Sequence, residues 1–404
     1  MKIHRNLAVG VIRGLELILI QKQALRPSLN KILKQNNKWG SRDRRTIGEA
    51  LLDCIRWKRY YEYLGDLNPA SVNYLWELFG VWILTKEGLL ATWEEFLNIQ
   101  NLKLKSPQNQ ESLPLQIRAS IPDWLDELGR KSFEETVWKE ECQAFNAQAP
   151  LVLRANTLKG KAKDLLHQLN KDLMLNAVLS EDVPEAIVID KHQNLSQHPL
   201  YREGRFEIQD ANSQRVAHWV KPKAEDLIID ACAGSGGKSL HLAALMENKG
   251  KIIAFDTAKK LELLKKRAAR NGVTIIETIP IDTNHTKQLA EGIATAVLID
   301  APCSGLGVLR RNPAAKWHMN PEKIEALLKL QEEILQKNAL LVKKGGLLVY
   351  ATCSIFPDEN QYQITRFLDS EKGQYFELEK AQTFLTHQTQ FDGFYIAKLK
   401  RKTD

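Results

Sequence analysis

Two cysteines are the residues whose type and position most clearly permit chemistry. Cys303 lies in the segment Asp300-Ala-Pro-Cys-Ser-Gly-Leu-Gly, and Cys353 lies in Tyr350-Ala-Thr-Cys-Ser-Ile-Phe-Pro. Each follows an apolar run of strand character, so each is expected where a buried strand ends, which is where open α/β sheets place their sites. A thiolate at such a position can act as a nucleophile. The alternative for either thiol is a buried, unreactive side chain, since free cysteine is often fully buried.

A third predicted strand end carries the glycine-rich loop Asp230-Ala-Cys-Ala-Gly-Ser-Gly-Gly-Lys-Ser. Glycines after a strand let the backbone turn tightly and approach a ligand. A P-loop is excluded because Cys232 stands where the first glycine of that motif is required, and the nicotinamide fingerprint is excluded because its third glycine is missing. The candidate cofactor-binding residues of this loop are Cys232, Ala233, Gly234, Ser235, Gly236, Gly237 and Lys238.

Three aspartates follow successive predicted strands. Asp256 ends the second strand, Asp282 follows the third, and Asp300 ends the fourth. A carboxylate at the end of the second strand can accept hydrogen bonds from both hydroxyls of a ribose. S-adenosylmethionine has a ribose, an adenine amino group and a charged amino acid tail, so acids placed in this way suit it. The alternative is that each aspartate only caps the following helix.

Charge and cysteine content limit the classes of partner. The net charge is +8, and residues 1–50 alone hold 11 Lys and Arg against 3 Asp and Glu. This concentration favours a nucleic acid partner, with a solvated basic face as the alternative. The five cysteines form no C-x-x-C pair, so we expect neither a metal site nor a disulfide framework. With no apolar run long enough to span a membrane and no signal peptide at Met1, we expect a cytoplasmic protein without a membrane partner.

The pattern of elements predicts three domains, at residues 1–112, 113–203 and 204–404. The first is helical, and the polar, proline-bounded segment 106–114 is a predicted linker. The second is a small α/β module. In the third, strands alternate with amphipathic helices, which predicts a mostly parallel sheet with helices on both faces. Its strands are expected at 227–230, 252–256, 275–281, 296–300 and 347–351, and a long helix at 320–344.

With these loops in place, the chain resembles the RNA cytosine-C5 methyltransferases of the RsmB/NOP type, most closely the bacterial 16S rRNA enzymes. Pro-Cys-Ser and Thr-Cys-Ser fifty residues apart, both after strands, are specific to that family. The other matching segments are Gln209-Asp210, Asp230-Ala-Cys-Ala, Gly236-Gly-Lys238, Asp300 to Pro313, Lys316-Trp317, Glu359-Asn360 and Asp392 to Ala397, with weaker matches at 121–125 and 153–157. The chain departs from the family at Gly234-Ser235, where Ala-Pro is usual, and at Ala314, where an acid is usual.

The resemblance implies a Rossmann-like class I methyltransferase domain, preceded by the α/β module and by a helical, NusB-like RNA-binding domain. It implies that Cys353 adds to C6 of cytosine, that Cys303 assists release, and that S-adenosylmethionine donates the methyl group. We add the hypothesis that Lys238 supplies positive charge beside the Cys353 thiolate. Asp300 serves either the amino group of the cofactor or N3 of the cytosine, and the sequence leaves both open.

The substrate is expected to be a single-stranded or looped site in RNA, because the target base must leave any helix. Near Cys303, Arg310, Arg311 and Lys316 are predicted to hold phosphates, and Trp317 either stacks on a base or packs. The basic residues predicted to extend this footprint are Lys31, Lys34, Lys38, Arg42, Arg44 and Arg45. We expect a monomer that modifies rRNA. The alternatives are a tRNA methyltransferase of the same family and a non-catalytic RNA-binding or ribosome assembly factor.

Overall fold

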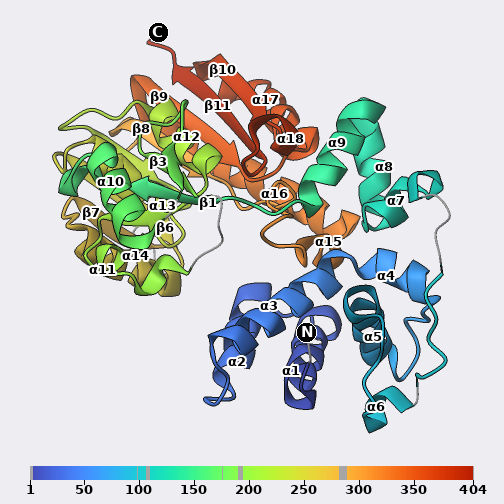
Figure 1. Ribbon diagram of the computed structural model, residues 1–404. Coiled ribbons are helices and arrows are strands. Elements are labelled where there is room, and N and C mark those ends of the chain that lie inside the picture. Colours follow the sequence, from blue (N-terminus) through green and yellow to red (C-terminus); the bar gives the residue numbers. More distant parts are fainter. Residues whose placement is uncertain are drawn as a thin grey trace. The chain divides into compact units, whose positions relative to one another are not determined.

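The computed structural model describes residues 3–97, 99–105, 110–174, 176–189, 194–281 and 289–403, and Figure 1 shows its elements. The chain forms two compact units: a helical unit, Met1–Ala147 with Leu309–Pro321, and a sheet unit, Gln148–Val308 with Glu322–Asp404. These units divide the chain differently from the three predicted domains, because the helices before residue 147 group with the N-terminal helices. Residues 106–109 of the predicted linker lie outside the described residues.

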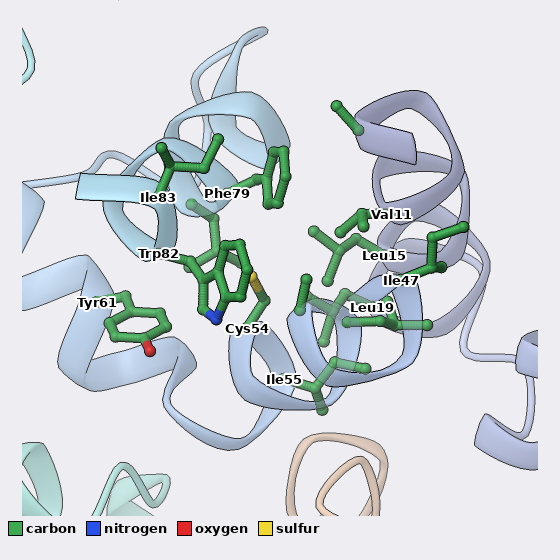
Figure 2. Packing of buried hydrophobic residues seen from close by; sticks show 14 of the residues in the cluster. Val11, Leu15, Leu19, Ile47, Cys54, Ile55, Tyr61, Phe79, Trp82 and Ile83 are labelled. Atoms are coloured by element: carbon green, nitrogen blue, oxygen red, sulfur yellow. The ribbon is translucent and has the colours of Figure 1, made fainter. Parts of the chain in front are cut away.

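Apolar residues at three-and-four spacing build the helical unit. In Figure 2, side chains of α1 (Arg5–Leu15), α3 (Ser41–Arg56) and α5 (Tyr74–Glu87) point toward one another. Cys54 is buried there beside Trp82, as expected for a core cysteine. The remaining elements are a π-helical turn at Glu16–Ile20, α2 (Leu25–Lys34), α4 (Lys58–Gly65), α6 (Glu94–Leu97), η2 (Gln110–Ser112), α7 (Leu115–Arg118), α8 (Asp123–Ser132), α9 (Glu135–Asn146) and α15 (Ala315–His318).

The sheet unit begins with a four-stranded antiparallel sheet in the order β2-β3-β1-β4. On the central strand, Leu153 pairs with Ile187 on one side and with Ile208 on the other. Its elements are β1 (Leu151–Ala155), α10 (Ala162–Leu173), β2 (Ala177–Leu179), β3 (Ala186–Ile189), α11 (Pro199–Arg202) and β4 (Phe206–Ile208). Leu165 and Leu169 of α10 pack against apolar residues of this sheet. This small sheet precedes the larger one in the chain and belongs to the same compact unit.

The larger sheet has the strand order β10-β11-β9-β8-β5-β6-β7. Its strands are β5 (Leu227–Asp230), β6 (Lys251–Asp256), β7 (Ile276–Pro280), β8 (Ala294–Asp300), β9 (Val342–Thr352), β10 (Phe376–Phe384) and β11 (Phe394–Arg401). Strands β7, β6, β5, β8 and β9 are parallel, and β11 is antiparallel to both β9 and β10. The chain moves outward from β5 to β7 and then returns to β8 on the other side of β5. Ligands of open α/β sheets bind where the strand order reverses in this way.

Helices cover both faces of this sheet, which confirms the predicted Rossmann-like methyltransferase fold. One apolar cluster contains Val216, Leu240 and Leu261 from α12 (Ala211–Val220), α13 (Gly237–Leu245) and α14 (Ala258–Asn271). A second cluster contains Leu335 and Phe367 from α16 (Pro321–Asn338) and α17 (Gln361–Leu368). The short helix α18 spans Thr386–Thr389. Among the described helices, none is both long and apolar enough to cross a lipid bilayer.

The long helix predicted at 320–344 is shorter than expected. Helix α16 ends at Asn338, and Lys343 and Lys344 belong to strand β9. The strand starts early because Val342 is buried and pairs with Ala294 of β8. Exposed lysines beside a glycine pair resemble a helix C-terminus in sequence, so the prediction of the helix end was wrong.

Candidate active site

The carboxyl ends of the parallel strands place the predicted loops at one edge of the sheet. Hydrogen bonds between neighbouring strands continue just beyond the strand ends: Ala233 N donates to Phe255 O over 2.9 Å, and Ala301 N donates to Ala351 O over 2.8 Å. The loops after β5, β6, β8 and β9 therefore leave the sheet from the same edge. This is the edge at which the sequence places its thiols, acids and glycines.

The two predicted catalytic thiols lie in contact. Cys303 Sγ and Cys353 Sγ are 3.2 Å apart, and both side chains are half-buried. The hydrogen bond with Cys353, together with burial, raises the pKa of the Cys303 thiol well above its usual value. Cys303 therefore keeps its proton at neutral pH and can donate it to the sulfur of Cys353. This arrangement is consistent with the prediction that Cys353 is the attacking sulfur.

A buried carboxylate fixes the loop that carries Cys303. Glu359 Oε1 accepts from Ser304 N over 2.8 Å, and Glu359 Oε2 accepts from Ser304 Oγ over 2.5 Å. Gln331 Nε2 donates to Glu359 Oε1 over 3.1 Å and to Pro302 O over 3.0 Å. Charge-assisted bonds of this kind are stronger than those between neutral groups. The loop is thus held on both sides of the cysteine.

The backbone of Cys353 is packed closely against two glycines. Gly307 N donates to Cys353 O over 2.9 Å, and Gly393 N donates to Gly307 O over 2.7 Å. A Cβ atom on Gly307 would lie 2.2 Å from Gly393 O, so no other residue fits there without backbone movement. This contact ties the loops after β8 and β9 to each other and to the start of β11.

Lys238, in the first turn of α13, and Asp300, at the end of β8, form an ion pair. Lys238 Nζ donates to Asp300 Oδ2 over 2.6 Å, and the two side chains are 9% and 30% exposed. The ammonium group also lies 5.1 Å from the centroid of the Phe394 ring. The structure thus gives Lys238 an acid as its ion-pair partner, while its predicted effect on the Cys353 thiolate stays a hypothesis. Asp300 remains exposed enough to meet a ligand.

The glycine-rich loop and Asp256 fit a ribose-containing cofactor. Asp256 accepts from Gly234 N over 2.8 Å and from Thr257 N over 2.7 Å, and Lys260 Nζ lies 3.1 Å from its Oδ1. The Lys260 side chain is 56% exposed, so it can move aside and leave each oxygen a lone pair for a ribose hydroxyl. At Gly234, φ is +58° and no atom lies within 4 Å of the place where a Cβ would stand, which leaves room for a ligand. Asp282, also predicted to bind the cofactor, lies outside the described residues.

The buried Asp230 and the half-buried Cys232 lie at the start of this loop. Asp230 accepts from Ser239 Oγ over 2.6 Å, and burial raises the pKa of this carboxyl to about 6. Burial also raises the pKa of Cys232, so its thiol stays protonated. At Gly236, φ is +88° and a Cβ would lie 2.6 Å from Leu264, so the turn into α13 requires glycine. These side chains hold the start of the loop and its turn into α13.

Comparison with known proteins identifies the family of this chain. Residues 217–400 match the family described as 16S rRNA methyltransferase RsmB/F, and residues 121–196 match the ferredoxin-like domain of RsmF/B-like methyltransferases. The chain is 36% identical over 315 residues to the probable ribosomal RNA small subunit methyltransferase B of Synechocystis sp., covering 74% of this chain and 70% of that protein. The chain belongs to the RsmB/F family. The resemblance predicted from the two cysteine motifs is confirmed.

Other proteins match this chain over different lengths. The ribosomal RNA small subunit methyltransferase B of Escherichia coli is 28% identical over 439 residues, covering 100% of both chains. A solved methyltransferase homologue from Pyrococcus horikoshii is 26% identical, with a TM-score of 0.63 over 74% of this chain and 100% of its own. NSun6 from Pyrococcus horikoshii with SFG has a TM-score of 0.64 over 70% of this chain and 98% of its own, and at 23% identity it supports the fold alone.

An arginine that the sequence did not suggest holds the loop at the family departure Gly234-Ser235. Arg267 Nη1 donates to both Ser235 O and Ser235 Oγ over 2.8 Å. Arg267 is itself paired with the buried Glu207 at 2.9 Å. The serine therefore supplies an acceptor that a proline would lack. The buried Arg154 holds the other end of the loop by donating to Gly237 O over 2.5 Å.

Two of the residues predicted to hold RNA phosphates near Cys303 are buried in the helical unit. Lys316 Nζ donates to Arg56 O over 2.9 Å, and both Arg310 and Lys316 are at most 4% exposed. Their predicted role in this RsmB/F-family chain was therefore wrong. Trp317 Nε1 donates to Ile55 O over 2.7 Å, which supports the packing alternative. Arg311 is half-buried, and its contact with phosphate stays a prediction.

Replacing the buried lysine is expected to stabilise the helical unit. Burial lowers the pKa of Lys316 from 10.5 to about 7. The folded chain thus binds fewer protons than the unfolded chain between these values, so stability from this group rises with pH over that range. We expect Lys316→Met to raise the free energy of unfolding at pH 6 by about 1–3 kcal/mol. This value is the gain from removing a buried charge minus the cost of the one hydrogen bond that is lost. Urea denaturation at pH 6 and pH 9 measures this, and equal pH dependence in both proteins would contradict it.

Proposed function

We propose that this protein transfers a methyl group from S-adenosylmethionine to C5 of a cytosine in 16S rRNA. The observation that carries the proposal is the pair of thiols 3.2 Å apart, at the ends of the neighbouring parallel strands β8 and β9. Relatives of this chain are named as ribosomal RNA small subunit methyltransferases. The proposal extends that RNA substrate to this chain. C5 of cytosine requires a nucleophilic thiol, and the chain presents one beside a cofactor loop.

The chemistry explains why a thiol is needed. C5 of the aromatic cytosine ring is a poor nucleophile. When Cys353 Sγ bonds to C6, the ring loses aromaticity and C5 becomes an enamine carbon that can accept a methyl group. The proton on C5 must then leave, and the C6–S bond breaks as the C5–C6 double bond reforms. The cofactor, when bound, supplies the electrophilic methyl group of its sulfonium.

Cys303 is proposed to act in the second half of this reaction. Its thiol is 3.2 Å from the attacking sulfur, so it lies beside C6 and C5 once the Cys353–C6 bond exists. During attack it holds its proton and orients Cys353. For release, Cys303 first loses its own proton to solvent. The resulting thiolate takes the C5 proton, directly or through a bound water, while Cys353 leaves C6 as a thiolate. Glu359 holds the loop at Ser304 and so keeps Cys303 in this place.

Asp300 and Lys238 are proposed to act as a unit. The carboxylate, held by Lys238 Nζ at 2.6 Å, can hold the amino group of the cofactor or, when it carries a proton, donate to cytosine N3 as negative charge grows there during the attack on C6. Asp300→Asn separates these roles. If Asp300 holds the cofactor, affinity for S-adenosylmethionine falls about tenfold; if it serves N3, affinity is unchanged and kcat falls about a hundredfold. Calorimetry and single-turnover methylation give the two values, and an unchanged variant would exclude both roles.

Asp256 is proposed to bind the ribose of S-adenosylmethionine. Asp256→Ala removes both acceptor oxygens and also frees Gly234 N. We expect its affinity for the cofactor to fall by about tenfold or more, because two charge-assisted hydrogen bonds are lost. Titration calorimetry measures this, and Asp164→Ala, an exposed aspartate on α10, is the matched control. If both variants bound S-adenosylmethionine with equal affinity, Asp256 would not be part of the cofactor site.

RNA binding is proposed to use the basic surface of the helical unit. Five of its six predicted cationic side chains are exposed, namely Lys31, Lys34, Lys38, Arg42 and Arg45. Arg44 instead donates to the backbone oxygens of Trp39 and Leu33 within the unit. Affinity that depends on these side chains must fall as salt rises, through release of counterions from the phosphates.

Bisulfite sequencing of total RNA from cells with and without this protein tests the proposed function. We expect one or a few cytosines of 16S rRNA to lose protection when the protein is absent. Loss of protection in tRNA alone would favour the tRNA methyltransferase of the same family. No change in RNA, together with no heat of binding at millimolar S-adenosylmethionine, would favour the non-catalytic assembly factor.

A further inference from the structure

Three ligand-type side chains from separate segments meet inside the sheet unit. Glu185 directly precedes β3, His218 lies on α12, and His241 lies on α13. His218 Nε2 is 2.8 Å and His241 Nε2 is 3.7 Å from Glu185 Oε2. The ligand atoms of all three lie within 4.8 Å of one another. The absence of C-x-x-C pairs led us to expect no metal site. These three residues are far apart in the sequence, so no short spacing motif marks them as a group.

His241 lacks the hydrogen bonds that a buried imidazole requires. Its side chain is 1% exposed, and neither Nδ1 nor Nε2 has a hydrogen-bond partner among the described residues. A neutral imidazole has one donor and one acceptor, and leaving both unpaired in the interior is costly. Burial lowers the pKa of His241 to about 3, so the ring is neutral at pH 7, which is the form that binds metal ions.

The acid in this group is ionised. Burial alone would raise the pKa of Glu185, but the hydrogen bond from His218 and the nearby imidazole of His241 outweigh burial and hold that pKa well below its usual range. The group thus offers one carboxylate and two imidazoles. Two histidines and one glutamate form the ligand set of many zinc sites with an open fourth position.

We propose that Glu185, His218 and His241 bind a divalent transition metal ion of the zinc type. Tetrahedral zinc with bonds of about 2.0–2.2 Å places its ligand atoms about 3.4 Å apart. Side-chain adjustments of about 1 Å bring the three ligand atoms to that spacing. The His218 side chain is 33% exposed, which gives the ion an entry path and leaves a position for water.

Such an ion would join three elements and support the cofactor loop. Glu185 directly precedes β3 of the small sheet, and His241 lies on α13, whose first residues are Gly237 and Lys238. Metal binding would therefore fix α13 relative to α12 and to the small sheet. The positive charge of the buried Arg154, which also lowers the pKa of His241, opposes a cation here. We expect weaker binding than in a closed site with four protein ligands.

Zinc titration of the full chain tests the proposal. Cys303→Ser/Cys353→Ser is the background protein, because two adjacent thiols can also bind zinc. Equilibrium dialysis with Zn²⁺, and titration with Co²⁺ followed by its visible absorption, should show one ion per chain. Glu185→Gln and His241→Gln should each lower affinity at least tenfold. His167→Gln, an exposed histidine on α10 of the same unit, should bind as the background protein does.

If His241→Gln does not fold, His218→Gln provides a second test, because the His218 side chain is half-exposed and its replacement disturbs the core less. Zn²⁺ should raise the melting temperature of the background protein and leave that of His218→Gln unchanged, since only binding to the folded chain stabilises it. No bound ion at 100 µM Zn²⁺ would overturn the proposal. Zinc affinity that is undiminished in both Glu185→Gln and His218→Gln would also overturn the proposal, because the ion would then bind elsewhere.

Discussion

Replacement of Cys353 by alanine is expected to abolish methyl transfer and to leave cofactor binding intact. The variant loses the only atom proposed to bond to C6, so C5 stays aromatic and unreactive. Removing a covalent nucleophile lowers turnover by about 10³-fold or more. The cofactor loop follows β5 and has its own supports at Asp256 and Arg267. Transfer of a labelled methyl group to 16S rRNA measures the first effect, and titration calorimetry with S-adenosylmethionine measures the second.

A core cysteine provides the matched control for this experiment. Cys142 is fully buried in α9, and burial raises the pKa of its thiol, as expected for an unreactive side chain. Cys142→Ala should lower stability by about 1–2 kcal/mol through the lost packing while turnover stays near that of the wild type. Methylation by Cys353→Ala at the rate of this control would exclude the proposed covalent mechanism.

The strand ends of the site could be predicted because buried parallel strands leave a strong pattern. Strand β5 has the predicted bounds, and β6 and β8 both end at the predicted aspartates. Continuous apolar runs identify such strands, and the polar residue that follows each run marks the edge of the sheet. The thiols, glycines and acids could therefore be assigned to one edge before any contact was known.

The contacts that hold the loops could not be predicted in the same way. Glu359 binds Ser304 across 55 residues of sequence, and Arg267 binds Ser235 across 32. Neither pair follows a helical or strand repeat, so only the tertiary fold brings the partners together. The only hint in the sequence was that Glu359 matches a family motif, and that match did not indicate what its side chain binds.

Charge misled the sequence reasoning at two places. Lysine is usually exposed, but Lys316 is buried. Its ammonium group donates a hydrogen bond to the backbone oxygen of Arg56 inside the helical unit. Strand β10 was not predicted because most of its residues are polar and exposed, with Glu377 and Lys380 among them. Charged residues on an edge strand prevent pairing with other chains, so this composition suits the position of β10 at the end of the sheet.

Replacement of Cys303 by alanine is expected to trap the protein on its RNA. The variant keeps Cys353, so the C6–S bond still forms and C5 still receives its methyl group. Release then slows, because the thiol proposed to help remove the C5 proton is gone. The bond between Cys353 and the methylated base should persist for at least a hundredfold longer than in the wild type. A denaturing gel with labelled 16S rRNA and S-adenosylmethionine should show a protein–RNA species of low mobility.

The double variant Cys303→Ala/Cys353→Ala distinguishes a covalent adduct from tight binding. Both proteins lack the thiol at 303, but only the single variant has a sulfur that can bond to C6, so the species of low mobility should be absent from the double variant. Glu359→Gln provides a graded test, since it weakens the bonds to Ser304 that hold the Cys303 loop and should give a smaller amount of the adduct. Normal release of methylated RNA by Cys303→Ala would show that the second thiol has no part in the reaction, and the 3.2 Å contact would then serve only to orient Cys353.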